Sequence, residues 1–532
     1  MNTFIQRHQA DIHGVLSGFD RVRFRGTRRS VSFPKGVMTL LYVLRILLKN
    51  FAAFFEGQTT KLKAATEKLA KATPVGHVHY VNRPGESKEA IVARLVEEHR
   101  VPDDYSGLVA VLSCVEPCDT FEIYRNREEQ KLEVRSIFHK CLHYYLYIRH
   151  PKFGFLHIRI QSWFPFRVQI CMNGREWLAQ QLDEAGIAYT RYGNSFAWVG
   201  DFKAAQQLFD SQLQTVWPEM LSGLLREYHP GFVQLTEEMQ LREPYWTSEQ
   251  TEWATDVSFR SAETLERLFP RLVRHAILGL GCADTMRFLQ QKLTRRGTIA
   301  GQVKKDVVND VKARAEGTRV KHRLGANSVK MYDKPGGSGQ KNTILRIETT
   351  IHNAESLKVY RPKEGKPEGP LQWRSLRRGV ADLYRRCELS QKTNEAYLEA
   401  MAVVDAPETL GSVATPLSER ATRKGRRYRG LQVLSAADSR VLQVLNRGEF
   451  TIAGIRNRDL RAALYGPTSA DAKERKQQSA RASRWFALMQ AHGLIQKVNK
   501  SHRYTMTAQG RLCATAVLAA ADANIQTLAL AA

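Results

Sequence analysis

The sequence has few cysteines and no long uninterrupted apolar run. Its 532 residues include 7 cysteines, an odd and scattered set that argues against a disulfide framework and predicts a reducing compartment. The most apolar stretch, "GVMTLLYVLRILLKNFAAFF", is interrupted by Arg45 and Lys49, which predicts an amphipathic helix or two buried helices rather than a membrane span. The first residues lack the apolar segment of a signal peptide. We therefore expect a cytoplasmic protein of bacterial type without a membrane partner.

Several common enzyme motifs are also absent, and there are too few acidic residues to neutralise the basic ones. No Walker loop, GxSxG elbow or dinucleotide fingerprint occurs, which disfavours ATPase, hydrolase and dehydrogenase functions. Lys and Arg number 80 against 53 Asp and Glu, a formal net charge of +27. So large an excess repels itself unless a polyanion is near, and nucleic acid is favoured over an anionic membrane. The 43% hydrophobic content is sufficient for ordinary buried cores.

The pattern along the chain predicts an α+β multidomain protein with mixed α/β N-terminal and central regions. We expect a basic strand and helices over residues 1–75, a mixed α/β domain over 76–232, a helical region with one β-hairpin over 233–405, a flexible basic linker over 406–430 and a compact unit over 431–532. No internal repeat is found. The linker contains Pro, Gly, Ser and a run of basic residues, which is typical of a mobile connection.

The C-terminal unit shows three helical patterns followed by two short strands. "SAADSRVLQVLNRG", "RNRDLRAALYG" and "RKQQSARASRWFALMQAHG" have helical spacing, and "LIQKVNKSHRYTMTAQGRL" predicts strands over 494–498 and 503–507 with a polar turn between them. The third helix has an apolar face and a basic face. The residues expected to contact DNA are Lys473, Lys476, Gln477, Arg481 and Arg484 on this helix and Lys497, Lys500 and Arg503 on the strands.

This layout resembles the MarR-type winged helix-turn-helix domains of bacterial transcription regulators, most specifically in "HGLIQK…RYTMTAQGR". The resemblance implies that the third helix enters the major groove while the β-ribbon lies on phosphates. Residues 411–532 contain 20 Lys and Arg against 7 Asp and Glu, a local excess of 20 − 7 = +13. We therefore expect sequence-specific DNA binding, by a transcription regulator or by a mobile-element or replication factor. The oligomeric state is left open, with a homodimer as one option.

A second unusual segment, "NSVKMYDKPGGSGQKNTILRIETTI" at 327–351, predicts a hairpin with a polar face and an apolar face. Val329, Met331, Leu345, Ile347 and Ile351 share the apolar face, and Lys330, Tyr332, Lys334, Arg346 and Glu348 share the polar one. Two lysines and an arginine on a rigid sheet suit a phosphate backbone, so Lys330, Lys334 and Arg346 are candidate phosphate ligands and Tyr332 a stacking platform. The alternative is an ordinary exposed hairpin with cross-strand salt bridges.

The Tyr-Asp-Lys strand followed by an Arg-x-Glu strand is also similar to a segment of the rolling-circle replication initiators of plasmids and filamentous phages. That resemblance implies DNA nicking by a tyrosine nucleophile with a divalent metal, Mg²⁺ or Mn²⁺, and nominates Tyr332 and Glu348. Asp333 is a further catalytic candidate, as a metal ligand or as a cap of the Gly-rich turn. The His-hydrophobe-His motif of those proteins is matched only by His77 and His79, far upstream. A metal-dependent nicking or nuclease enzyme is thus the alternative function.

Three other groups of residues have both a chemical and a purely structural interpretation. Cys114, Cys118, His139, Cys141 and His143 are either zinc ligands or buried side chains. Asp20, Glu116, Asp119, Asp333 and Glu348 would supply carboxylates to a two-metal nuclease if the fold brings them together. The segment "HYYLYIRHPKFGFLHIRIQSWFPFR" is either core or a stacking platform for a single strand, which leaves RNA binding as a third function.

Overall fold

The computed structural model shows a mixed α/β protein built around a large central sheet. It describes residues 2–82, 85–289, 307–314, 317–336, 341–363, 365–366, 368–405, 410–446, 450, 454–466, 469–498 and 501–522. The chain forms two compact units that alternate along the sequence. The first, here called the sheet unit, comprises Ile12–Ala262 and Tyr332–Lys392, and the second unit comprises Met1–Asp11, Glu263–Met331 and Thr393–Ala532. Each unit is therefore assembled from separate stretches of the chain, whereas the sequence predicted domains that follow one another.

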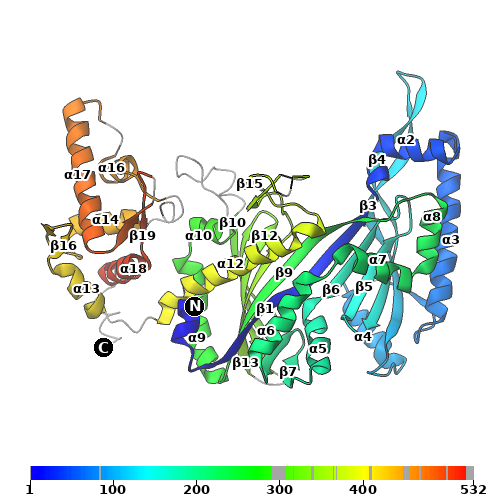
Figure 1. Ribbon diagram of the computed structural model, residues 1–532, viewed down its shortest axis with the longest axis horizontal. Coiled ribbons are helices and arrows are strands. Elements are labelled where there is room, and N and C mark those ends of the chain that lie inside the picture. The colour runs from blue at the N-terminus through cyan, green and yellow to red at the C-terminus, as the bar shows by residue number, and fades with distance from the viewer. Residues whose placement is uncertain are drawn as a thin grey trace. The chain divides into compact units, whose positions relative to one another are not determined.

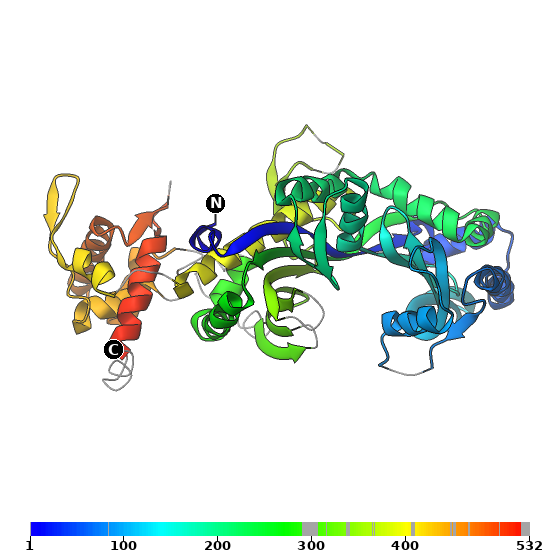
Figure 2. The same cartoon turned by 90° about the horizontal axis from the view of Figure 1, so that it is seen from below.

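The sheet unit contains long strands in the order β12-β13-β9-β1-β6-β5-β4-β3-β2. Their bounds are β1 Ile12–Thr27, β2 Val78–Tyr80, β3 Gly107–Asn126, β4 Lys131–His150, β5 Gly154–Gln161, β6 Val168–Asn173, β9 Tyr245–Phe259, β12 Asn327–Pro335 and β13 Asn342–Ile351. The described pairs are antiparallel except β2 with β3. The boundary between the units passes through β12. β1, blue in Figures 1 and 2, pairs with β9 along almost its whole length.

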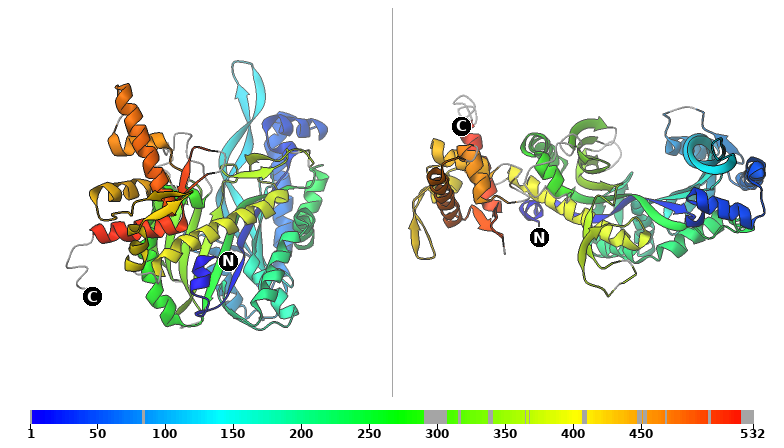
Figure 3. Two further views of the ribbon diagram at one scale, coloured as in Figure 1. Left: turned by 60° about the vertical axis from the view of Figure 1, so that its left-hand side comes forward. Right: turned by 90° about the horizontal axis from the view of Figure 1, so that it is seen from above.

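Two smaller hairpins, seven complete α-helices and the first half of α12 (Leu383–Met401) also belong to the described part of the sheet unit. The hairpins are β7 Tyr189–Tyr192 with β8 Ser195–Val199, and β14 Lys358–Arg361 with β15 Gln372–Ser375. The helices are α2 Pro34–Val43, α3 Phe51–Lys71, α4 Lys88–Glu98, α5 Gly174–Glu184, α6 Phe202–Ser211, α7 Trp217–Tyr228 and α8 Pro230–Glu238. The distal halves of β3 and β4 extend beyond the neighbouring strands as a two-stranded ribbon, cyan in Figure 3, because β4 pairs with β5 only from His143 to His150.

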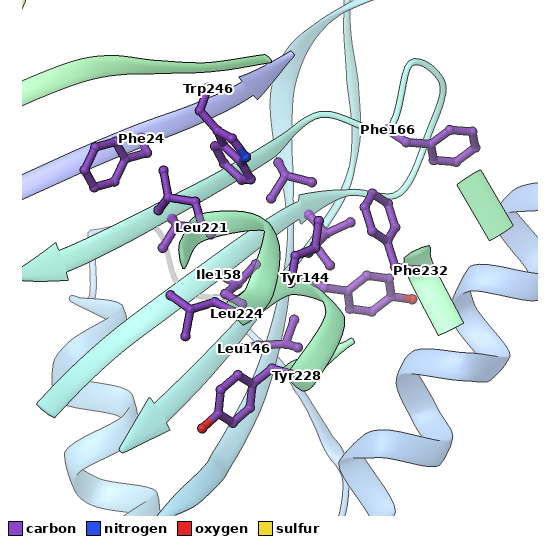
Figure 4. Packing of buried hydrophobic residues seen from close by; sticks show 14 of the residues in the cluster. Phe24, Tyr144, Leu146, Ile158, Phe166, Leu221, Leu224, Tyr228, Phe232 and Trp246 are labelled. Carbon is purple, nitrogen blue, oxygen red and sulfur yellow. The ribbon is translucent and has the colours of Figure 1, made fainter. Parts of the chain in front are cut away.

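The main core lies on one face of the sheet. Leu221, Leu224 and Tyr228 of α7 pack over side chains of β4 and β5 such as Leu146 and Ile158 (Figure 4). Burial of each side chain of this size stabilises the folded state by about 1.5–3 kcal/mol relative to an exposed side chain. Much of the aromatic segment expected as core or as a stacking platform belongs to this core, since Tyr144, Phe153 and Phe164 are buried in it.

The other face of the sheet is only partly covered. Near Leu16, α5 and α6 pack on β1, and Gly18 lets the ring of Phe209 lie directly on the strand. Further along β1, Arg21, Arg23 and Arg25 emerge on this face at every second position. The candidate functional site occupies this second face.

β9 corrects one expectation from the sequence. Residues 233–405 were expected to be helical apart from one hairpin, yet Tyr245–Phe259 form a central strand between β13 and β1. Its side chains are buried from Trp253 to Phe259 on both faces, so it lacks the clear apolar–polar alternation of a half-exposed strand. A strand covered on both sides is hard to distinguish from a buried helix by periodicity.

The second unit contains helices, strands and the C-terminal segment. Its elements before residue 430 are α1 Thr3–Arg7, α9 Ala262–Arg274, a π-helix His275–Gly279, α10 Cys282–Phe288, β10 Val307–Arg314, β11 Gly317–Leu324, the first half of β12, the second half of α12 Leu383–Met401, α13 Leu410–Ser418, β16 Ala421–Arg423 and β17 Arg426–Tyr428. The sequence predicted a flexible basic linker over 406–430, and the described part of this segment forms the helix α13 and the β16–β17 hairpin.

The C-terminal segment has the three helices and two strands expected from the sequence. They are α14 Ala436–Leu445, α16 Asn457–Tyr465, α17 Ala472–Ala491, β18 Ile495–Lys497 and β19 Tyr504–Met506, followed by α18 Ala508–Asp522. Leu442, Leu460 and Phe486 share one buried core. An isolated bridge joins Ile455 to Tyr504, so a third extended segment accompanies the hairpin.

The long apolar stretch near the N-terminus forms α2 and α3. No single helix among the described residues is long and apolar enough to cross a membrane, and the one pair that passes the same test together, α2 with Leu48–Lys71, is bent by 96°.

Candidate functional site

Three carboxylates from distant parts of the chain converge on the partly covered sheet face. Asp20 of β1, Glu252 of β9 and Glu348 of β13 each place an oxygen within 4.8 Å of the others. We call these residues the carboxylate trio. Carboxylate oxygens are the preferred protein ligands of Mg²⁺ and Mn²⁺, so the trio could hold such an ion.

The backbone explains how Asp20 reaches this position. Phe19 pairs with Trp253 and Arg21 pairs with Glu252, so Asp20 is the additional residue of a β-bulge. Bulges redirect a side chain out of the regular alternation of the strand. On β13, Thr350 pairs with Glu252, which places Glu348 diagonally opposite Glu252 on the same face.

A buried ion-pair network borders the trio. Arg346 of β13 donates from Nη1 to Asp20 Oδ1 over 2.8 Å and from Nε to Asp256 Oδ1 over 2.6 Å. Arg175 of α5 adds a second cation, with Nη1 3.1 Å from Asp256 Oδ2. Burial opposes ionisation of Asp256, but the charges of Arg175 and Arg346 outweigh it and lower the pKa of this carboxyl. Asp256 therefore stays ionised and holds Arg346 against Asp20.

The network corrects the expectation that Arg346 binds a phosphate backbone. Its side chain is fully buried, and two carboxylates and the main-chain oxygen of Asn194 occupy its donors. The reason is that the polar face of the hairpin is covered rather than open: Tyr332 is 8% and Glu348 4% exposed. Around Tyr332, Arg346 and Glu348 both faces of the hairpin are thus covered, whereas Glu252 of the neighbouring β9 is partly exposed.

The other residues of the hairpin differ in their surroundings. Val329, Met331, Leu345, Ile347 and Ile351 are buried, which confirms the predicted apolar face. Lys334 is half-buried near the trio, and burial together with the charge of Arg346 lowers its pKa, although Asp20 and Glu348 act in the opposite direction. Its ammonium lies 5.4 Å from the ring centre of Tyr332. Lys330 is half-buried.

Not all of the carboxylates proposed as metal ligands meet. Asp333 lies on the opposite side of β12 from Tyr332 by strand alternation and is not part of the trio. Glu116 and Asp119 lie on β3, which β4, β5 and β6 separate from β1 in the sheet. Glu116 binds Arg159, and Asp119 binds Arg167. Glu252 was not a candidate. The polar series Gln250, Glu252 and Asp256 at even positions of "EQTEWATD" could have indicated it, once that segment is taken as a strand.

The cysteine and histidine group is smaller than the proposed zinc set. Cys118, Cys141 and His143 place ligand atoms within 4.8 Å of one another, and the two sulfurs are 3.0 Å apart. Cys114 and His139 do not belong to this group. Burial lowers the pKa of His143 to about 4, so its imidazole is neutral near pH 7, as a metal ligand must be. These three residues would leave one position of a tetrahedral zinc ion to another ligand.

In the C-terminal segment, the predicted basic face of α17 is exposed. Lys473, Lys476, Gln477, Arg481 and Arg484 are all exposed, as is Lys497 of β18. Arg503 is half-buried and donates to the main-chain oxygen of Gly454 over 3.3 Å. Lys500 lies outside the described residues. Contact of these side chains with DNA remains a prediction.

No protein-family model, curated protein or solved structure matches this chain.

Proposed function

We propose that the protein binds duplex DNA through residues 431–522 and that these residues form a winged helix-turn-helix. The order of α14, the extended segment at Ile455, α16, α17 and the β18–β19 hairpin supports this assignment. Asn457 at the start of α16 fixes the two central helices by donating to Ser479 O and Ser483 Oγ of α17, each over 2.9 Å.

The observation that carries the proposal is the exposed basic face of α17. An α-helix fits the major groove, where polar side chains reach base edges and cations neutralise phosphates. The exposed residues of α17 recur at helical spacing from Lys473 to Arg484, on the side away from the buried Ala482 and Phe486. Lys497 places a further cation on the hairpin next to this helix.

Selection of duplexes from a random pool, followed by binding measurements at several salt concentrations, tests the proposal. Arg481→Ala and Arg484→Ala should each weaken binding to the selected duplex, and a phosphate contact should reduce the slope of log K against log[salt] by about 1. Arg440→Ala removes an exposed arginine from α14 and serves as the control. Unchanged affinity in both α17 variants would contradict the proposal.

A second activity, metal-dependent cleavage of a phosphodiester, is favoured by the carboxylate trio. Mg²⁺ or Mn²⁺ held by Asp20, Glu252 and Glu348 would stabilise the charge that develops on the phosphoryl oxygens. One P–O bond breaks, and the oxygen of either water or the Tyr332 hydroxyl forms the new bond to phosphorus. The attacking group releases its proton to solvent, and the leaving oxygen takes up a proton. Lys334, near both the trio and Tyr332, supplies a cation for the leaving or attacking oxygen.

Supercoiled plasmid incubated with the protein and Mg²⁺ or Mn²⁺ tests this activity. Nicking should be lost in Glu252→Gln and Glu348→Gln but retained in Glu243→Gln, which changes an exposed carboxylate paired with Arg226 at the surface. Loss of nicking in Tyr332→Phe, with a protein–DNA adduct in wild type, would assign the tyrosine as nucleophile. Full activity in Tyr332→Phe would assign water. A wild-type rate in Glu252→Gln would refute catalysis at the trio.

A further inference from the structure

We propose that a cavity on the partly covered sheet face, distinct from the carboxylate trio, binds the phosphates and a base of single-stranded nucleic acid. The cavity has a volume of about 360 Å³. Arg23 and Arg25 of β1, Arg159 of β5 and Arg167 line it together with Phe138 and Tyr145 of β4. None of Asp20, Glu252 and Glu348 lines it.

Carboxylates hold three of the four arginines in place. Arg159 Nη2 is 2.7 Å from Glu116 Oε2, Arg167 binds Asp119, and Arg25 binds Glu249. Glu116 also accepts from Lys88 Nζ over 2.9 Å. These contacts fix the orientation of each guanidinium while leaving further N–H groups for a ligand.

Arg23 is different because no acidic residue balances it within the described part of the chain. Its half-buried side chain forms no ion pair there. Four arginines line the cavity against the three carboxylates of Glu116, Asp119 and Glu249, so its lining carries one excess positive charge. An anionic ligand such as a phosphate would compensate this charge, and arginine is well suited to it because its planar fork binds two phosphate oxygens.

The aromatic residue beside these arginines favours a nucleotide over a small anion. Phe138 is 72% exposed and pairs with Asp119 in the β3–β4 ribbon, beyond His143, where the pairing of β4 with β5 ends. A large aromatic ring exposed to this extent next to cations offers a stacking surface, which is worth about 1–3 kcal/mol per base. Tyr145 forms the adjoining wall, with its hydroxyl donated to Glu116 over 2.7 Å.

The arrangement favours a single strand over a duplex or a free nucleotide. A base can stack on Phe138 only when it is not paired inside a double helix. Arg25 and Arg23 in the wall of the cavity and Arg21 beyond it follow one another along β1 at intervals of about 7 Å, two residues of a strand. This row of cations suits an extended polynucleotide, and it leads from the cavity towards Asp20. The inference depends neither on cleavage at the trio nor on duplex binding by α17.

Fluorescence anisotropy with the full-length protein and a short labelled oligonucleotide tests the cavity. The oligonucleotide is offered as single-stranded DNA, as single-stranded RNA and as a DNA duplex, at matched salt. Arg23→Gln and Phe138→Ala should each weaken single-strand binding by about tenfold, a loss equivalent to roughly 1.4 kcal/mol. Arg125→Gln, an exposed arginine on the same ribbon but not at the cavity, is the control and should bind as wild type.

Crosslinking gives an independent test. Irradiation of a bromodeoxyuridine-substituted single strand bound to wild-type protein should label the peptide that contains Phe138. Wild-type single-strand affinity in both cavity variants, or crosslinks confined to residues 431–522, would overturn the inference. Duplex affinity should be unchanged in Arg23→Gln and reduced in Arg484→Ala. If neither Arg481→Ala nor Arg484→Ala has an effect while the cavity variants do, the winged-helix proposal fails and the cavity remains supported.

Discussion

Arg346 and Asp256 form a bidentate ion pair in the interior of the sheet unit, with Nε 2.6 Å from Oδ1 and Nη2 2.8 Å from Oδ2. Neither side chain is exposed by more than 1%. The third nitrogen of the same guanidinium binds Asp20, so one arginine connects the interior of the sheet to the carboxylate trio.

Breaking this pair should strongly destabilise the protein. Arg346→Met would leave the buried Asp256 with Arg175 as its remaining ion-pair partner, and removal of one partner of a buried pair costs about 3–5 kcal/mol. Urea-induced unfolding of the variant and of wild type measures the difference. Arg226→Met breaks an exposed pair with Glu243 and should cost about 0–1 kcal/mol. Equal effects of the two substitutions would show that the buried pair contributes little.

His229 should make stability depend on pH. Its Nδ1 accepts from the backbone N–H of Phe232 at the start of α8, and its Nε2 lies 3.0 Å from Thr66 Oγ1, so protonation of Nδ1 breaks a cap. Burial lowers its pKa to about 4, below the unfolded value of about 6.5. Between these two pKa values the unfolded chain binds more protons than the folded protein. The free energy of unfolding is therefore highest above pH 6.5 and falls by about 3 kcal/mol as the pH decreases towards 4.

Unfolding free energies of wild type and His229→Asn between pH 7 and pH 4 measure this effect. Asparagine retains an acceptor suited to a helix N-cap but does not titrate, so the variant should lose less stability on acidification. His502→Asn changes an exposed histidine and should follow wild type. The assignment to His229 is wrong if all three proteins show the same pH dependence.

Gly18 should tolerate no side chain. A Cβ at this position would lie 2.5 Å from ring atoms of Phe209, which packs α6 on β1. Gly18→Ala should therefore destabilise the protein by about 1–3 kcal/mol. Gly57→Ala in α3 meets no atom within 4 Å and should stabilise by up to about 1 kcal/mol. The midpoint temperatures of thermal unfolding of the two variants and of wild type measure these effects. The midpoint should fall in Gly18→Ala and should not fall in Gly57→Ala.

The carboxylate trio should bind Mn²⁺ without nucleic acid. Isothermal titration with Mn²⁺ is expected to show one site in wild type and a clear loss of affinity in Glu348→Gln, because one charged oxygen ligand is removed. Glu243→Gln should bind Mn²⁺ as wild type does. Undiminished binding by Glu348→Gln would place the ion elsewhere, and absence of binding by wild type would remove the metal from the proposed cleavage.

Periodicity along the sequence was sufficient to locate many elements. The alternation in 327–351 predicted β12 and β13, and helical spacing predicted α17 with an exposed basic face. It failed for β9, whose side chains are buried on both faces, and for α13 and the β16–β17 hairpin, which lie in a segment with the composition of a linker.

The sequence by itself determined which side chains share one face of a strand or helix, because that depends only on the local backbone repeat. It could not decide whether the face of Tyr332, Arg346 and Glu348 is open or covered. Only the tertiary structure placed Glu252 between Asp20 and Glu348, since the register of three strands far apart in sequence is set by long-range pairing and by the bulge at Asp20. A shift of one residue in either pairing would turn the carboxylates to the opposite face of the sheet.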